Sequence, residues 1–147
     1  MPPGAAFAFL DNPDASWPTE SGADLGYRVL GRVLGEDRIP RFRYRLGDCV
    51  IEERSEPILS DRGGGMRRRF RVTTDKVTSP LWLRAAVGDS AVLKDGEWKV
   101  AGKQGRVLRF DDSVQPLMRK SENGEEVVVP LAPAPGRPVE FAFEIWW

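Results

Sequence analysis

The feature that most constrains the fold is a series of short runs in which apolar and polar residues alternate, separated by Gly, Pro, Asn and Asp. In the clearest run, residues 39–46, three arginines alternate with three apolar residues: Arg41, Phe42, Arg43, Tyr44, Arg45 and Leu46. Because successive side chains of a strand point to opposite faces, this run predicts a strand with one core face and one charged, solvated face. No stretch of 12 residues has the 3.6-residue periodicity of an amphipathic helix.

About ten such runs, five to eight residues long, follow one another along the chain, and turn signals lie between them. Gly47-Asp48, Asp95-Gly96 and Asn123-Gly124 predict tight hairpin turns. Residues 63–65, three glycines, predict a flexible connection, and the proline-rich residues 130–138 predict an extended crossing between sheets. We therefore expect an all-β fold, an antiparallel two-sheet β-sandwich, with residues 1–147 as a single domain and residues 1–26 partly loop-like.

Composition excludes several classes of function. The 22 basic and 22 acidic side chains cancel, whereas a dedicated nucleic-acid binder has a basic excess. The chain has no histidine, the commonest general base and metal ligand, and Cys49 alone forms neither an intrachain disulfide nor a zinc cage. No apolar run approaches the ~20 residues of a membrane span. We expect no catalytic residue, no metal, no cofactor, no nucleic acid and no membrane span, and Cys49 is predicted to be a core residue.

Two acidic groups are weak candidates for chemistry. Residues 11–14 offer oxygen ligands, but their spacing does not match an EF-hand and Asx turns explain the loop. Asp111 and Asp112 are neighbours, and in a strand they would point to opposite faces, which makes them a poor acid/base couple.

The arginine rows are candidates for ligand binding. Arg41, Arg43 and Arg45 could form one ribbon with the second arginine row, at 67, 69 and 71, if the two strands pair. Arginine forks match phosphate and carboxylate, so such a ribbon would bind an anion. The alternative is a solvated sheet face that is balanced by nearby glutamates, at 52, 53 and 56, and protected from edge aggregation by its charge.

Five tryptophans are many for this length. Trp82 and Trp98 have apolar neighbours and are predicted to be core residues. Trp17 lies in a loop and Trp146 faces outward, so these two are candidate platforms for stacking a carbohydrate. Trp146 and Trp147 are also candidates for an interface, because exposed apolar patches mark interfaces. The chain ends within its last strand, as we expect of a domain cut from a longer chain, so a following domain could form the contact.

Three stretches together resemble a known family: GYR (residues 26–28) continuing to IPRFRYRLG (39–47), MRRRFRV (66–72) and LWLRAA (81–86). The set resembles a β-rich accessory domain of large exported bacterial proteins that combine sugar-dehydrogenase-like propellers with c-type cytochrome domains. The resemblance implies a periplasmic or extracellular redox assembly in which this segment connects or recognises other domains. It gives this chain no haem, because the attachment motif Cys-x-x-Cys-His is absent.

Three functions remain open. The first is a non-catalytic accessory or interaction module that contacts neighbouring domains of a longer chain or a protein partner. The second is a carbohydrate-binding module, which requires two or more exposed aromatic residues on one face or rim. The third is a small sugar-active, epimerase-like enzyme using carboxylates, which the absence of histidine disfavours. Compartment and ligand are not determined by the residues alone.

Overall fold

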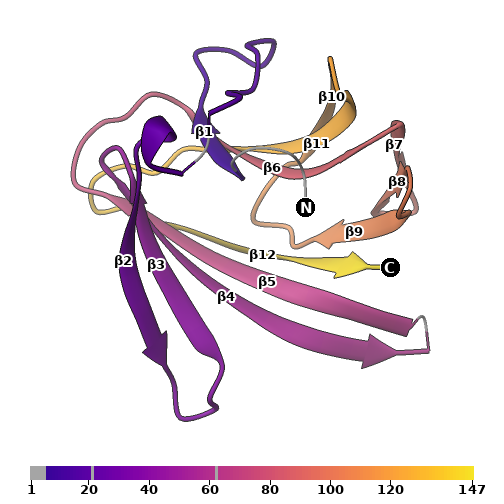
Figure 1. Cartoon of the computed structure of the whole chain (residues 1–147), viewed down its shortest axis with the longest axis horizontal. Helices are drawn as coiled ribbons and strands as arrows, with labels where there is room; N and C mark the ends of the chain where they lie inside the picture. Colours follow the sequence, from indigo (N-terminus) through magenta and orange to yellow (C-terminus); the bar gives the residue numbers. More distant parts are fainter. Residues whose placement is uncertain (1–5, 21, 62) are drawn as a thin grey trace.

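The computed structural model describes residues 6–20, 22–61 and 63–147, and twelve strands within them form two antiparallel sheets that pack face to face (Figure 1). The smaller sheet has the order β1 (Phe7–Phe9), β6 (Leu81–Gly88), β11 (Gly124–Leu131), β10 (Leu117–Ser121). The larger sheet has the order β2 (Tyr27–Leu34), β3 (Pro40–Leu46), β4 (Cys49–Ser60), β5 (Gly63–Thr74), β12 (Val139–Trp146), β9 (Arg106–Phe110), β8 (Glu97–Ala101), β7 (Ser90–Lys94). The predicted all-β sandwich is confirmed, and a single 3₁₀ turn, η1 (Gly22–Leu25), precedes β2 within the described ranges.

The core lies between the two sheets and is built from the alternating apolar residues. A row of stacked phenylalanines crosses the larger sheet, with ring centroids 5.1 Å apart for Phe70 and Phe141 and 4.9 Å for Phe110 and Phe143. Cys49 is fully buried in this core, and Trp98 packs at its border with 8 % of its surface exposed. The predicted core positions of Cys49, Trp82 and Trp98 are confirmed.

The hairpin turns follow the sequence signals with one difference. Asp95 and Gly96 both have positive φ, 53° and 77°, which is the backbone of a tight two-residue hairpin turn. At the Asn-Gly signal the turn is Glu122-Asn123, and Gly124 already begins β11 with a φ of 114°. A Cβ there would lie 2.2 Å from the Gly88 carbonyl oxygen, so the close approach of two backbones requires glycine.

The sequence predicted a flexible connection at the three glycines of residues 63–65, and this prediction is wrong. They are the first residues of β5 and pair with the last three residues of β4, Ile58, Leu59 and Ser60. A Cβ on Gly65 would lie 2.8 Å from the Trp146 ring, so the missing side chain is what admits the tryptophan. Both β4 and β5 are therefore twelve residues long.

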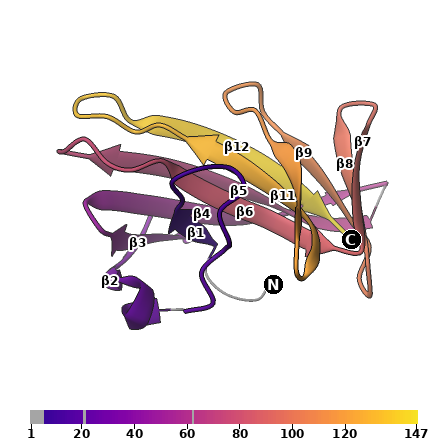
Figure 2. The ribbon, with the colours of Figure 1, turned by 90° about the horizontal axis from the view of Figure 1, so that it is seen from above.

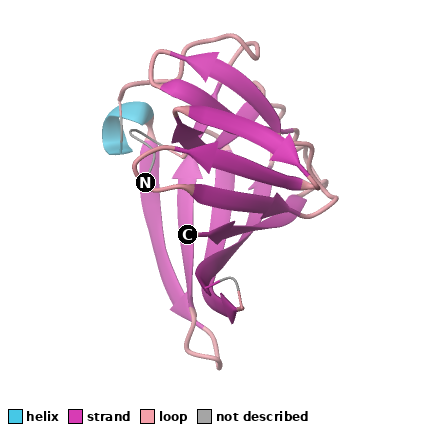
Figure 3. Cartoon of the chain, turned by 90° about the vertical axis from the view of Figure 1, so that its right-hand side faces the viewer, coloured by secondary structure: helices cyan, strands magenta, loops and turns pink. Residues whose placement is uncertain are grey.

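The larger sheet extends beyond the smaller one. The distal parts of β2, β3, β4 and β5 project past the two-layered region, and the β2–β3 hairpin forms a separate arm of the molecule (Figures 1 and 3). On the other side, the chain after β1 crosses the outer side of the smaller sheet (Figure 2). Along β3, the face that contributes to the core loses its cover toward the tip of the hairpin. Leu46 is 2 % exposed, whereas Phe42, nearer the tip, is 45 % exposed. The expectation that Phe42 is buried is wrong because no second layer covers the arm.

Candidate functional site

The outer face of the larger sheet carries an alternating row of charges. Arg43, Glu52, Arg71 and Glu140 lie directly opposite one another on β3, β4, β5 and β12. Arg43 Nε is 2.9 Å from Glu52 Oε1, and Arg71 Nη1 is 2.5 Å from Glu140 Oε1. A parallel row places Glu56, Arg67 and Glu144 opposite one another on β4, β5 and β12, and Arg67 binds Glu144.

The two arginine rows of the sequence share this face, but they do not form one ribbon. Strand β4 lies between β3 and β5, and it inserts Glu52 and Glu56 between the two rows. The third glutamate that we expected to balance this face, Glu53, points to the inner side, where its Oε1 is 2.6 Å from Arg68 Nη2. The single anion-binding ribbon is therefore replaced by a lattice of opposite charges.

One row of the lattice has like charges opposite one another. Arg41, Arg54 and Arg69 lie in register across β3, β4 and β5. Arg54 binds two carboxylates, with Nη2 2.5 Å from Asp37 Oδ2 and Nε 2.8 Å from Glu56 Oε1. Arg41 makes no ion pair with any residue that the structure describes, and it is the unneutralised member of the row.

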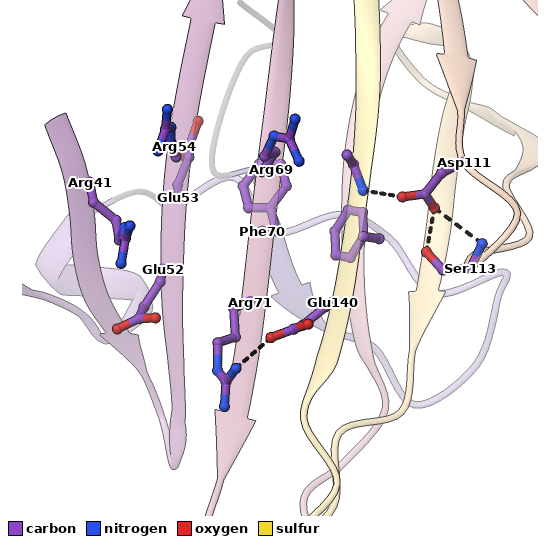
Figure 4. Close-up of a pocket in the computed structure, with 12 residues that line it drawn as sticks. Arg41, Glu52, Glu53, Arg54, Arg69, Phe70, Arg71, Asp111, Ser113 and Glu140 are labelled. Atoms are coloured by element: carbon purple, nitrogen blue, oxygen red, sulfur yellow. Dashed lines mark hydrogen bonds and ion pairs between the residues drawn. The ribbon is translucent and has the colours of Figure 1, made fainter. Parts of the chain in front are cut away.

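Beside this row the surface is hollowed (Figure 4), and Ala142 of β12, which has a short side chain, is one of the residues that line the hollow. The hollow has a volume of about 490 Å³. Its polar rim comes from β3, β4, β5, β12 and the segment after β9, and consists of Arg41, Glu52, Arg54, Arg69, Arg71, Asp111 and Glu140. A second hollow of similar size, about 480 Å³, adjoins it across Ala142 and is bordered by Arg67, Arg109 and Glu144.

Asp111 closes the edge of the hollow with a fixed carboxylate. Strand β9 separates from β12 at this point, and Asp111 Oδ2 accepts a hydrogen bond of 2.6 Å from the Ala142 N–H. Its Oδ1 accepts a hydrogen bond of 3.1 Å from the Ser113 N–H and a second from the Ser113 hydroxyl. This carboxylate replaces a backbone acceptor of the sheet, so its role here is structural.

The electrostatics of the lattice favour permanent charge. The hydrogen bond from Arg67 lowers the pKa of the Glu144 carboxyl, and the same contact raises the pKa of the Arg67 guanidinium. A general base at neutral pH needs a raised carboxyl pKa, and Glu144 shows the opposite. Glu144 is therefore held as a charged partner of Arg67 and is not poised as a general base.

The edge of the larger sheet next to β3 differs from the lattice. Strand β2 has one free edge, and four large apolar side chains on it are exposed: Val29 (82 %), Leu30 (42 %), Val33 (60 %) and Leu34 (62 %). The pairing places Val33 on the same face as Arg41, and Leu34 on the face of Phe42. Both faces of the strand therefore present apolar surface to solvent.

We call β2 and β3, with their connecting turn, the edge hairpin. All three arginines that the sequence predicted as ligand-binding residues lie on this hairpin. Arg43 is paired with Glu52, whereas Arg41 and Arg45 make no ion pair with a described residue. Arg45 lies directly opposite Arg28. Sequence reasoning missed the exposure of β2, because a strand with apolar residues on both faces is typical of a covered central position.

Trp17 is not an exposed platform, and that expectation is wrong. It is 8 % exposed and packs with Trp82 and Val128 on the outer side of the smaller sheet. Two guanidinium groups lie over its ring, that of Arg84 at 4.8 Å and that of Arg119 at 5.4 Å from the ring centroid.

A buried ion cluster holds this loop in place. Glu126 is fully buried, and its two oxygens accept hydrogen bonds of 3.1 Å from Arg84 Nη1 and 2.7 Å from Arg119 Nε. Arg119 Nη1 also donates to the carbonyl oxygens of Pro13, at 3.0 Å, and Ala15, at 2.7 Å. This cluster was not predicted from the sequence; the signal that could have found it is Arg84 within the apolar run 81–87 and Glu126 next to the apolar run 127–129.

The last two tryptophans occupy different environments. Trp146 is half-buried on the outer face, over Gly65, and its Nε1 donates to Glu144 Oε2 at 3.3 Å. Trp147 is 64 % exposed, and its N–H donates to the Gly64 carbonyl oxygen at 3.4 Å. Trp17 and Trp146 lie on the outer sides of opposite sheets, so the fold does not bring the two predicted platforms together.

No helix within the described residues has the length and apolar character needed to cross a membrane. Comparison of the chain with protein-family models finds no match, and comparison with curated proteins finds none either.

Proposed function

We propose that this chain is a non-catalytic interaction module that binds a neighbouring domain or a partner protein through its edge hairpin. The observation that carries the proposal is the exposure of four large apolar side chains on one free sheet edge. Contiguous exposed apolar surface on a folded domain marks an interaction site. An uncovered edge strand is also a hazard for aggregation, which a permanent or frequent partner removes.

The charged hollow supports the same proposal and disfavours the enzymatic alternative. Its glutamates are bound to arginines, and Asp111 is bound to backbone and hydroxyl donors. An epimerase-like reaction needs carboxylates that are free to take a proton from a substrate, and these carboxylates are already occupied by arginine, backbone and hydroxyl donors.

The positions of the tryptophans disfavour the carbohydrate alternative. It requires two exposed aromatic residues on one face, and Trp17 is buried while Trp146 is half-buried on the other side of the sandwich. For the partner we propose what the resemblance implies, the propeller and c-type cytochrome domains of an exported redox protein.

Binding to such domains tests the proposal. The folded chain is immobilised, and a propeller domain and a c-type cytochrome domain from proteins of the family that it resembles are added in a biolayer interferometry titration. The edge variant Val33→Ser/Leu34→Ser is compared with Val77→Ser/Leu59→Ser, which makes the same two changes at side chains that are 89 % exposed elsewhere. We expect the edge variant to weaken binding by about tenfold or more and the control to bind like the unmodified chain.

Two results would contradict the proposal. In the first, no neighbouring domain binds the folded chain. In the second, both variants bind equally well, which would move the contact away from the edge hairpin. A saturable change in tryptophan fluorescence on titration with one class of oligosaccharide would favour the carbohydrate-binding module instead.

A further inference from the structure

The four edge strands of the two sheets are not alike. Three of them are short: β1 has three residues, and β7 and β10 have five each. β7 ends in Lys94, and β10 carries Arg119 and Lys120. Short length and charge are common protections against pairing with another chain. The fourth edge, β2, has eight residues; it carries Arg28 and Arg32, but between and beside them it exposes four large apolar side chains.

The charge lattice is incomplete at this edge. Across β12, β5, β4 and β3 the order is Glu, Arg, Glu, Arg, so a further strand of the same pattern would carry a carboxylate. On β2 this row meets Gly31, which has no side chain to pair with Arg43. Next to it, Arg28 lies directly opposite Arg45, and like charges in this position destabilise a sheet. Neither arginine makes an ion pair with a described residue, and the same is true of Arg32 and Arg41.

We propose that the free edge of β2 binds an extended acidic segment of the partner by strand addition. This inference rests on the proposed function and names the chemistry of its partner. Carboxylates of the added strand bind Arg28 and Arg45 on the outer face, and its alternate apolar side chains pack on Val29 and Leu34 on the inner face. Main-chain hydrogen bonds to the free edge give affinity, while the alternating side chains give specificity.

A second copy of this chain fits the edge less well. Pairing β2 with β2 of another molecule would bring two arginine-rich edges together, and this repulsion opposes a dimer. The bulge at Leu30 divides the free edge, because the β2–β3 register shifts between Val29 and Gly31. The bulge leaves two uninterrupted stretches, residues 27–29, which include Arg28 and Val29, and residues 31–34, and an added strand of about nine residues spans both.

A synthetic peptide of about nine residues, in which glutamate alternates with valine and threonine, is the probe for this inference. Two matched peptides carry lysine in place of glutamate, or a central proline that cannot join a ladder. Binding is measured by fluorescence anisotropy, and backbone pairing by hydrogen–deuterium exchange of β2. We expect the acidic peptide to bind at least about tenfold more tightly than either control and to slow exchange at residues 31–34.

Charge reversal provides the matched variant. In Arg28→Glu/Arg45→Glu the preference should switch to the lysine peptide, whereas Lys103→Glu/Arg137→Glu, at exposed loop positions, should keep the acidic preference. Equal binding of the acidic and lysine peptides would overturn the inference. So would binding of the acidic peptide without slower exchange in β2, or slower exchange caused by self-association of the chain.

The failure of this inference can be told apart from the failure of the proposed function. A neighbouring domain that binds through Val33 and Leu34 without slowing exchange at residues 31–34 would retain the interaction module and overturn strand addition. If no neighbouring domain binds at all, both are lost.

Discussion

Replacing Glu126 with glutamine should destabilise the domain severely, although the change is nearly isosteric. Glu126 has no exposed surface, and the side chains of Arg84 and Arg119 are 2 % and 9 % exposed. The substitution leaves two guanidinium groups in a buried site without the carboxylate that binds both. Burial already lowers the pKa of the Arg84 guanidinium, which shows that its charge is costly at this position.

The magnitude follows from the contacts that are lost. Glu126 accepts one hydrogen bond from each arginine, at 3.1 and 2.7 Å, and bonds to charged groups contribute about 1.5–3 kcal/mol each. Removing one partner of a buried ion pair costs about 3–5 kcal/mol, in agreement with that sum. A domain of this kind has about 5–15 kcal/mol of total stability, so the variant should lose a large part of it.

Urea unfolding followed by tryptophan fluorescence measures the effect, and Glu122→Gln, in the exposed turn beside the cluster, is the control. The control should change the free energy of unfolding by less than about 0.5 kcal/mol. Adding Arg84→Met to the Glu126→Gln variant should recover part of the loss, because it removes one of the uncompensated charges. A loss below about 1 kcal/mol for Glu126→Gln would refute the reasoning, since it would mean that the two arginines need no buried counter-ion.

Three further predictions concern the larger sheet. Burial raises the pKa of Tyr27 to about 12, so the contribution of the neutral phenol to stability is full below pH 10 and is lost as the pH rises toward 12. Tyr27→Phe should remove this pH dependence. It should also cost about 1–3 kcal/mol in urea unfolding at pH 7, because the hydroxyl accepts a hydrogen bond from Phe7 N–H and donates one to the Phe7 carbonyl oxygen. Gly31 has a φ of 130°, so Gly31→Ala should lower stability by about 1–3 kcal/mol in thermal unfolding, whereas Gly105→Ala, with open space and no positive φ, should not. The arginine partner of Glu144 lowers the pKa of its carboxyl, so the contribution of Glu144 to the free energy of unfolding is present above pH 4.5 and is lost as the pH falls through the lowered pKa. In urea unfolding, Glu144→Gln should therefore lower the free energy of unfolding by up to about 1 kcal/mol at pH 7 and by almost nothing at pH 2.

Alternation within a strand predicted the faces of the sheets but not what covers them. In residues 39–46 the apolar and arginine sets do lie on opposite faces of β3, as period two requires. The same apolar face is buried at Leu46 and exposed at Phe42, because the smaller sheet ends between them. Cover depends on the relative lengths of strands that are distant in sequence, and no local pattern contains that information.

Predicting the candidate site requires the order of the strands in the sheet, which the sequence does not contain. The arginines of β3 and β5 were recognised as rows, but whether they join depends on β4 lying between them. Trp17 was predicted to be exposed because it lies in a proline-containing loop. That reasoning could not include Arg84 and Arg119, which hold the ring and the loop against the smaller sheet from strands remote in the sequence.

The two sheets use charge in opposite ways, and this difference bears on where a partner binds. On the smaller sheet, Glu126 and its arginines are buried under the loop that contains Trp17, so this outer face is already covered. On the larger sheet the charges are paired across strands at the surface, where ion pairs contribute little and water remains. At the edge of the larger sheet, β2 combines exposed apolar residues with arginines that make no ion pair with a described carboxylate. A partner there gains both hydrophobic burial and charge pairing, and this argues for approach along the edge of the sandwich and not onto either face.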